Sequence, residues 1–373
     1  MRVLHVYKDY PPVMGGIEHH IQTLAEGLLA QGVDVHVLVT NTDRKTLKGE
    51  INGVPVTKTG RLLNISSAPI SLSFCSEFKR LSRDADIVHL HVPYPPAELC
   101  QLAFHGGRHF VLTYHSDIVR QRVMGFFYFP FLRRVLRSSE RIIVSNPKYI
   151  ALSRFLRPWA DKCRVIHLGI DLERFIPTPA VQQRAAAIRR RYNDVPLLLF
   201  VGRLRHYKGI EVLIDALKEV EAHALIVGEG PMGNIWKQKA VDEGVIERIT
   251  FLGEVSEDDL VALYYAGDMF VLPSTNRAES WGIVQVEAMA CGLPVICTEL
   301  GTGTSYVNQH EVTGLVIEPN NSSALIEAIQ RLIDDPDLRH RLGQAGQARA
   351  NEAMSKEAMI GKMMALYAEI TGL

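Results

Sequence analysis

The sequence lacks a long apolar run, an excess of either charge and a cysteine-rich pattern. No stretch of roughly 18 or more apolar residues occurs in its 373 residues, so we expect no membrane-spanning helix. The start, MRVLHVYKDYPP, has no apolar run typical of a secretion signal. The formal net charge is zero, which argues against bulk nucleic-acid binding, because such binding needs a net positive face.

Cysteine is scarce, and its spacing is uninformative. The five cysteines form no C-x-x-C pair: Cys75, Cys100, Cys163, Cys291 and Cys297. We therefore expect reduced thiols, mostly small core residues, in a cytoplasmic protein.

What is present is a repeated alternation of short apolar strands and helices. We expect strands in the first half at 2–7, 33–40, 86–92, 110–115 and 141–146, and in the second at 195–204, 223–230, 247–255, 268–274 and 294–299. This alternation predicts α/β architecture with parallel sheets covered on both faces. It is interrupted at 165–181, where we place a domain junction, and from Ser322 onward the chain reads as helical.

Ligands of open α/β sheets bind beyond the carboxyl ends of the strands, so residues that follow strands are the candidates. Gly15 and Gly16 precede a helix start, where free N–H groups can receive an anion, although a paired glycine is also a common flexible turn. Arg203 and Lys208 lie at a strand-to-helix turn, and their cations suit a diphosphate. His115 ends another strand, where a structural role is the alternative.

The stretch ESWGIVQVEAMACGLPVI, residues 279–296, carries two glutamates among apolar residues. Glu287 shares a helix face with Ile283 and Ala290, so its carboxylate needs a donor such as the two hydroxyls of a ribose. Glu279 precedes the helix, and eight helical residues would separate the two carboxylates by roughly 12 Å. That separation does not suit a retaining hydrolase pair at about 5–5.5 Å, so we expect the glutamates to bind different parts of one extended ligand.

With these motifs in order, the chain resembles the retaining glycosyltransferases of family 4, which have the GT-B fold. The matching segments cover essentially the whole chain: GGIEHH (15–20), HSD (115–117), GRLRHYKG (202–209), GEGP (228–231), FLGEV (251–255) and the E-x7-E pair. The resemblance implies two Rossmann-like domains facing across a cleft, with an acceptor-side domain over 1–170 and a donor-binding domain over 171–354. A final helix from about 355 to 373 would pack back on the first domain.

The resemblance also implies roles. Arg203, Lys208 and Gly16 would hold the donor diphosphate, Glu287 the ribose, Glu279 and the amides after it the sugar, and the backbone at Glu254 and Val255 the base. His115 would lie beside the transferred sugar. The expected donor-binding set is therefore Gly15, Gly16, Arg203, Lys208, Glu254, Val255, Glu279, Ser280, Trp281, Gly282, Ile283 and Glu287, and the expected catalytic set is His115, Glu279, Arg203 and Lys208.

Two departures from the family pattern narrow the prediction. Many members have a Gly-Gly-x-x-Glu run after the strand that follows E-x7-E, whereas this chain has GTGTSYVN at that place. The second departure is Trp281, which stands where a Phe is common. The Gly-Thr-Gly form is similar to bacterial mannosyltransferases of surface-polysaccharide assembly, which favours GDP-mannose. Because cations and a helix terminus can stabilise the leaving diphosphate, we expect neither a metal nor a cofactor, and a front-face attack by the acceptor hydroxyl. DAD at 84–86 precedes a strand, and we interpret it as a loop.

Residues 120–141 carry six arginines against one acid, interleaved with aromatics. Arg133, Arg137 and Arg141 recur at four-residue spacing, which predicts one basic helix face, although Pro130 is expected to break the stretch. Basic residues beside aromatics suit an anionic membrane surface, and an ordinary solvated helix is the alternative. The expected acceptor or membrane residues are Arg120, Arg122, Arg133, Arg134 and Arg137.

These inferences predict a cytoplasmic enzyme, peripheral on the inner face of the cytoplasmic membrane, that uses a polyprenyl-diphosphate-linked saccharide acceptor. A transferase of the same family that uses a UDP sugar remains an alternative. Two others are a nucleotide-sugar 2-epimerase, which would act on the donor alone, and a non-catalytic sugar-nucleotide-binding subunit.

Overall fold

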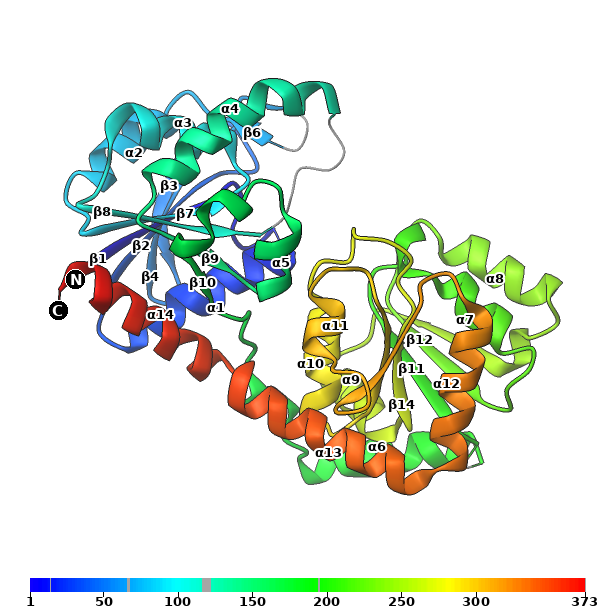
Figure 1. Cartoon of the computed structure of the whole chain (residues 1–373). Coiled ribbons are helices and arrows are strands. Elements are labelled where there is room, and N and C mark those ends of the chain that lie inside the picture. Colours follow the sequence, from blue (N-terminus) through cyan, green and yellow to red (C-terminus); the bar gives the residue numbers. More distant parts are fainter. Residues whose placement is uncertain (14, 66–67, 116–121, 194, 373) are drawn as a thin grey trace. The chain divides into compact units, whose positions relative to one another are not determined.

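A computed structural model describes the chain except residues 14, 66–67, 116–121, 194 and 373, and for residues 65 and 122–127 it describes the backbone alone. The chain folds into two compact units (Figure 1). Unit 1 is Met1–Gly169 with Lys356–Leu373, and unit 2 is Ile170–Ser355.

Unit 1 is built on an eight-stranded sheet in the order β10-β9-β8-β7-β1-β2-β4-β3. All its pairings are parallel except the antiparallel edge pair of β3 and β4. The strands are β1 (Arg2–Val6), β2 (Asp34–Thr40), β3 (Leu47–Ile51), β4 (Val54–Thr59), β7 (Ile87–Val92), β8 (His109–Tyr114), β9 (Arg141–Val144) and β10 (Cys163–Val165), with β5 (Leu63–Ile65) and β6 (Ala68–Ile70) forming a separate small hairpin.

The helices of unit 1 include the last one of the chain. They are α1 (Gly16–Ala30), α2 (Phe74–Ser82), α3 (Pro95–Phe104), α4 (Arg122–Ser138), α5 (Pro147–Leu152), the 3-10 helix η1 (Arg157–Lys162) and α14 (Lys356–Thr371). Met359, Met363 and Tyr367 of α14 are buried in the core of this unit. The hydroxyl of Tyr367 lies 2.6 Å from Nδ1 of His89 on β7, so the end of the chain completes the core around the sheet.

Unit 2 is built on a six-stranded parallel sheet in the order β13-β12-β11-β14-β15-β16. Its strands are β11 (Leu197–Val201), β12 (His223–Val227), β13 (Ile249–Gly253), β14 (Met269–Leu272), β15 (Val295–Thr298) and β16 (Gly314–Ile317). Its helices are α6 (Pro179–Arg191), α7 (Ile210–Ala216), α8 (Gly233–Asp242), α9 (Glu257–Ala266), α10 (Ile283–Ala290), α11 (Thr304–Val307), α12 (Ser322–Asp334) and α13 (Pro336–Ala353), with short 3-10 turns η2 (Leu172–Phe175), η3 (His206–Lys208) and η4 (Ile246–Arg248).

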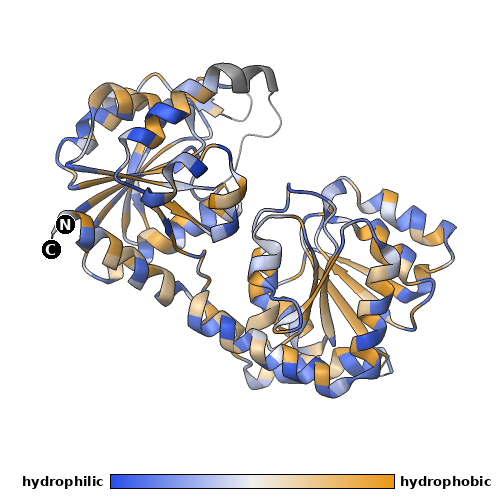
Figure 2. Cartoon of the chain, in the orientation of Figure 1, coloured by the Kyte–Doolittle hydropathy of each residue, from blue (hydrophilic) through white to orange (hydrophobic). Residues whose placement is uncertain are grey.

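The local sequence explains these elements. Strands such as LLLFV of β11 and MFVL of β14 are buried throughout, as expected for a parallel sheet covered on both faces, and Figure 2 shows the strands of unit 2 as mainly hydrophobic. Helix starts carry side-chain caps: Ser256 accepts the N–H of Asp259 at α9, and Asn321 accepts that of Ala324 at α12. None of the described helices is both long and apolar enough to cross a bilayer.

The structure differs from the elements predicted from sequence at several places. The Arg-rich helix α4 continues through Pro130, which therefore does not break it, and Arg141 lies on β9 rather than on the helix face of Arg133 and Arg137. Arg141 instead pairs with Glu369 of α14 at 2.5 Å. The β3–β4 hairpin, β16 and helix α6 were not expected; α6 begins within the segment interpreted as an aperiodic junction.

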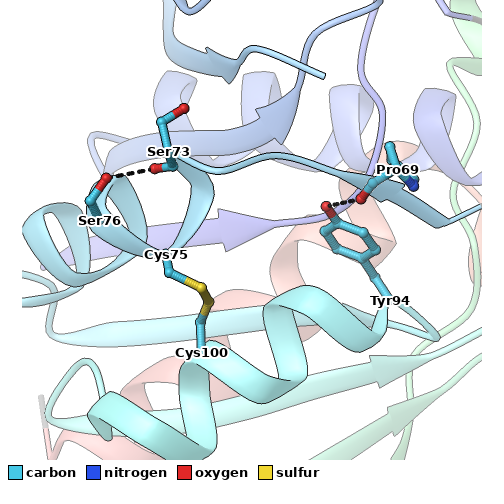
Figure 3. The surroundings of a disulfide bond; sticks show 6 residues. All are labelled: Pro69, Ser73, Cys75, Ser76, Tyr94 and Cys100. Atoms are coloured by element: carbon cyan, nitrogen blue, oxygen red, sulfur yellow. Dashed lines mark hydrogen bonds between the residues drawn. A yellow bond between two sulfur atoms is a disulfide. The ribbon is translucent and has the colours of Figure 1, made fainter. Parts of the chain in front are cut away.

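The prediction that all cysteines are reduced is wrong for two of them. Cys75 of α2 and Cys100 of α3 form a disulfide (Figure 3). The two helices pack side by side, with Phe74 and Tyr94 stacked edge to face nearby, so packing in three dimensions joins thiols that lie 25 residues apart. Cys163, Cys291 and Cys297 are buried thiols outside any disulfide that the structure describes.

Candidate active site

Unit 2 places two of the predicted residues in direct contact. The ammonium Nζ of Lys208, in η3, lies 2.6 Å from Oε2 of Glu279, and both side chains are 9% exposed. The same carboxylate oxygen accepts a hydrogen bond from the hydroxyl of Ser274 at 3.1 Å. Because an ammonium has three donors, Lys208 retains the capacity to bind an anion while it holds Glu279.

A glycine makes this placement possible. Gly209 follows Lys208 with φ of +69°, and a Cβ at this position would lie 2.0 Å from the carbonyl oxygen of Pro273. The chain at the end of β14 can therefore approach the turn after β11 closely, which brings Ser274 and the Glu279 loop to Lys208. The sequence motif GRLRHYKG thus ends in a residue with a steric requirement.

The Gly-Thr-Gly segment at 301–303, where the chain departs from the family pattern, packs against the loop that holds Glu279. The N–H of Gly303 donates to the carbonyl of Ser280 at 2.6 Å, and a Cβ on Gly303 would lie 2.6 Å from the indole of Trp281. Trp281 is buried, and Gly282 caps α10 in a left-handed conformation before Ile283 starts the helix. The two segments that differ from the family pattern therefore contact one another.

Glu287 lies on α10 with a partner from within the chain. Its Oε2 accepts a hydrogen bond from the hydroxyl of Tyr264, on α9, at 2.7 Å. Burial raises the pKa of Glu287, and the Tyr264 hydrogen bond offsets part of that shift. The described residues provide no hydrogen bond to its Oε1, which remains available to a ligand.

The other predicted donor residues follow strands in unit 2. Arg203 comes just after β11, is exposed, and has no ion-pair partner among the described residues. Glu254 and Val255 follow β13, where Glu254 is exposed and Val255 is half-buried. All three thus lie at the carboxyl edge of the sheet, where ligands of such sheets bind.

In unit 1, His115 directly follows β8 and is buried among other histidines. Its Nε2 lies 3.1 Å from Nδ1 of His91, whose Nε2 lies 3.1 Å from Nδ1 of His5. Burial places the pKa of His115 and His91 well below the ordinary value, so both imidazoles are neutral at pH 7. The rest of the HSD motif lies outside the described residues.

Gly15 and Gly16 lie where predicted, at the start of α1. Gly15 is the N-cap residue, and the carboxylate of Glu18 lies against it, with Oε2 2.4 Å from where a Cβ on Gly15 would stand. Glu18 is itself buried, and burial raises its pKa. A diphosphate at this helix start would therefore have to displace a carboxylate.

The predicted acceptor-side arginines border an open groove of 1220 Å³ in unit 1. Arg133, Arg134 and Arg137 of α4 line it together with apolar residues of α3, α4 and η1, among them Leu99, Phe131 and Trp159. Leu99 is 56% exposed, and Phe131 and Trp159 are partly buried, so the groove offers apolar surface beside the arginines. Arg120 lies outside the described residues, as does the side chain of Arg122.

Sequence reasoning missed the partners of these residues. Tyr264 and Ser274 were not singled out, and neither were the histidines buried around His115, which are His5, His20, His89 and His91. Of these, His5, His89 and His91 lie within otherwise apolar strands. That position was the available signal, because a polar side chain inside a buried strand needs a partner.

Comparison with known proteins agrees with the geometry. Residues 14–174 match the model of Glycosyltransferase Family 4, and residues 181–349 match Glycosyl transferases group 1. D-rhamnosyltransferase WbpZ of Pseudomonas aeruginosa is 37% identical over 94% of this chain and 91% of that protein. O-antigen chain mannosyltransferase C of Escherichia coli is 35% identical over 98% of each.

Two solved structures share the fold. Sucrose-phosphate synthase from Thermosynechococcus elongatus superposes with a TM-score of 0.79 at 25% identity, covering 100% of this chain and 99% of that one. Anabaena Alr3699/HepE in complex with UDP gives a TM-score of 0.81 at 20% identity, covering 99% and 100%.

The two parallel-sheet units, with their polar clusters at strand ends, define a glycosyltransferase of the GT-B fold, which confirms the fold predicted from sequence. Within that class, the chain belongs to glycosyltransferase family 4.

Proposed function

We propose that the protein is a retaining α-mannosyltransferase that uses GDP-mannose to extend a lipid-linked saccharide in cell-surface polysaccharide biosynthesis. The observation that carries the proposal is the 35% identity over 98% of the chain with O-antigen chain mannosyltransferase C. Relatives at 28–29% identity are named GDP-mannose-dependent mannosyltransferases, which supports the same donor.

In this proposal unit 2 binds the donor and unit 1 carries the acceptor side. Arg203 and Lys208 bind the diphosphate, Glu287 accepts hydrogen bonds from the ribose through its remaining oxygen, and Glu279 with the amides of Ser280–Ile283 orients the sugar. Glu254 and Val255 contact the base through their backbone. The buried Lys208–Glu279 pair fixes the carboxylate that orients the sugar next to the cation that holds its leaving group.

The reaction proposed is a front-face transfer. The acceptor hydroxyl attacks the anomeric carbon while the bond from that carbon to the diphosphate oxygen breaks, and the departing phosphate oxygen accepts the hydroxyl proton. Preorganised cations at Arg203 and Lys208 stabilise the charge that develops on the leaving group, so the step needs no metal at the diphosphate. The proposal also gives His115 the role of exchanging a hydrogen bond with a hydroxyl of the transferred sugar through its neutral imidazole.

Acceptor delivery is proposed to occur at the membrane. The groove bordered by Arg133, Arg134 and Arg137 combines cations with exposed apolar side chains, as an anionic lipid surface requires. Docking there would place the protein on the inner face of the cytoplasmic membrane, where a polyprenyl-diphosphate-linked acceptor is available.

A second donor has specific support. The relative at 37% identity is named a D-rhamnosyltransferase, and D-rhamnose is 6-deoxymannose. Both candidates share the manno configuration and differ at one hydroxyl, so the donor pocket must either bind or exclude the 6-hydroxyl.

A donor panel tests the proposal. Thermal stabilisation by GDP-mannose, GDP-D-rhamnose, UDP-glucose and ADP-glucose is compared, because a ligand that binds the native state stabilises it in proportion to log concentration over Kd. We expect GDP sugars to stabilise most, and the product formed from GDP-α-mannose to have α configuration by NMR. A preference for UDP sugars, a β-linked product, or an epimer formed from donor alone would overturn it.

A further inference from the structure

Five histidines form one buried cluster in unit 1. They come from four elements: His5 of β1, His20 of α1, His89 and His91 of β7, and His115 after β8. Neighbouring rings lie 4.6–6.0 Å apart between centroids. The donor-binding proposal uses only His115, so the other four have no role in it.

Hydrogen bonds within the protein do not satisfy this cluster. His89 is fully engaged, by Tyr367 on Nδ1 and by Thr113 on Nε2 at 2.7 Å. His20, by contrast, is 3% exposed, and neither of its ring nitrogens has a hydrogen-bond partner among the described residues. A buried polar group without a partner costs roughly 1–3 kcal/mol, which indicates that something further completes the site.

We propose that His20, His91 and His115 bind a divalent transition metal of the zinc class. One nitrogen from each of the three rings lies within 4.8 Å of the others. Zinc held by imidazoles at about 2.0–2.1 Å brings ligand nitrogens to roughly 3.4 Å of one another, so a small side-chain rotation closes the site. Nδ1 of His91 and Nε2 of His115 are already 3.1 Å apart.

The surroundings suit such an ion in two ways. Metals bind the neutral imidazole, and burial lowers the pKa of His20 to about 4 and those of His91 and His115 well below the ordinary value. The second nitrogen of His91 faces Nδ1 of His5 at 3.1 Å, which supplies the outer hydrogen bond that usually orients a metal-bound histidine.

A second group of three histidines, His5, His89 and His91, is as compact but less suited. Binding there could engage Nε2 of His5, which is also buried without a partner among the described residues. It would, however, break the hydrogen bond of His89 to Tyr367 or to Thr113 and leave both ring nitrogens of His20 unsatisfied. An all-imidazole set favours zinc, copper, nickel or cobalt over magnesium or calcium, which prefer oxygen ligands. The ion would tie α1 to the ends of β7 and β8 within unit 1.

The test uses the full-length protein stripped of metal with a chelator. Titration with Co²⁺ should give the visible spectrum of a tetrahedral site with one equivalent bound, and Zn²⁺ should displace it and raise Tm. His20→Phe keeps a ring of similar shape but removes the ligand, so zinc affinity should fall on the order of 100-fold or more. His340→Ala, which removes an exposed histidine of unit 2, should leave affinity unchanged.

The outcome does not depend on the stability of one variant. X-ray absorption of the zinc-loaded wild-type protein should show three imidazole nitrogens in the first shell. Absence of binding, equal affinity in His20→Phe, or a shell without imidazole would overturn the proposal and leave the cluster as a chain of hydrogen-bonded rings.

Discussion

The ammonium of Lys208 and the carboxylate of Glu279, separated by 71 residues in sequence, form a buried ion pair 2.6 Å long. Removing one partner of such a pair leaves an uncompensated charge, which typically costs 3–5 kcal/mol. We expect Lys208→Ala and Glu279→Ala each to lower the free energy of unfolding by about that amount, measured by chemical denaturation.

The double variant Lys208→Ala/Glu279→Ala should recover part of the loss, because both charges are then absent. Lys237→Ala, which removes an exposed lysine of α8, is the matched control and should change stability by less than about 0.5 kcal/mol. If the double variant lost as much free energy of unfolding as the two single variants together, the result would contradict the pairing.

The buried carboxylate of Glu287 should destabilise the ligand-free protein while it favours nucleotide binding. Burial raises its pKa, so the ionised carboxylate is less favourable in the folded state than in the unfolded state, and this penalty develops as pH rises through the folded-state pKa. Glu287→Gln should therefore raise Tm at pH 7–8 in the absence of ligand and weaken nucleotide binding by about 10-fold or more, measured by calorimetry.

Tyr264→Phe supplies the comparison. It removes the hydroxyl that donates to Glu287 and leaves the buried carboxylate less satisfied, so stability should fall by about 1–3 kcal/mol at pH 7–8. If both substitutions lowered Tm equally, the carboxylate would not be the destabilising group.

The histidine cluster should make the metal-free protein acid-labile. Burial lowers the pKa of His5 to about 3 and of His20 to about 4, and those of His89, His91 and His115 well below the ordinary value. Below pH 6.5 these histidines bind protons in the unfolded state but remain neutral in the folded state. Each of them therefore lowers the free energy of unfolding by about 1.4 kcal/mol per pH unit. We expect stability to fall steeply between pH 6.5 and 5, followed by circular dichroism.

Replacing one of these rings reduces the effect. In chelator-treated protein, His20→Phe should lower the pH dependence by about one proton, whereas His340→Ala should not change it. A pH profile in His20→Phe as steep as that of the wild type would contradict neutral burial of His20.

The basic groove should bind anionic membranes. Replacing Arg133, Arg134 and Arg137 with serine should reduce co-sedimentation with vesicles containing phosphatidylglycerol at low salt, since each basic residue near such a surface contributes about 1 kcal/mol. The control replaces Arg190 and Arg191, at the end of α6, with serine. If the groove variant still bound vesicles and the control variant did not, the membrane-docking surface would lie outside the groove.

Much of the fold could be predicted because buried parallel strands are short, apolar runs, and β1, β7, β11 and β14 show this pattern clearly. The β3–β4 hairpin could not, because LKGEI of β3 is largely exposed and carries no apolar alternation. Helix α6 could not be predicted either, because PAVQQRAAAIRRR buries few side chains and its apolar residues therefore show little helical periodicity.

The candidate site was predictable in its positions but not in its contacts. The ends of strands identify where Arg203, Lys208 and His115 lie, because chain order fixes which residues follow a parallel strand. Contacts depend on register and packing: His5 meets His89 because β1 and β7 pair in that register, and Cys75 meets Cys100 because α2 packs on α3.

The hydrogen bond between Tyr367 and His89 has a consequence during synthesis on the ribosome. Residues 170–355, which make up unit 2, emerge together and can fold while translation continues. The sheet of unit 1 is translated first, yet its core is completed only by Met359, Met363 and Tyr367, which are translated about 190 to 200 residues after Gly169. We therefore expect the unit whose sheet is translated first to complete its core last.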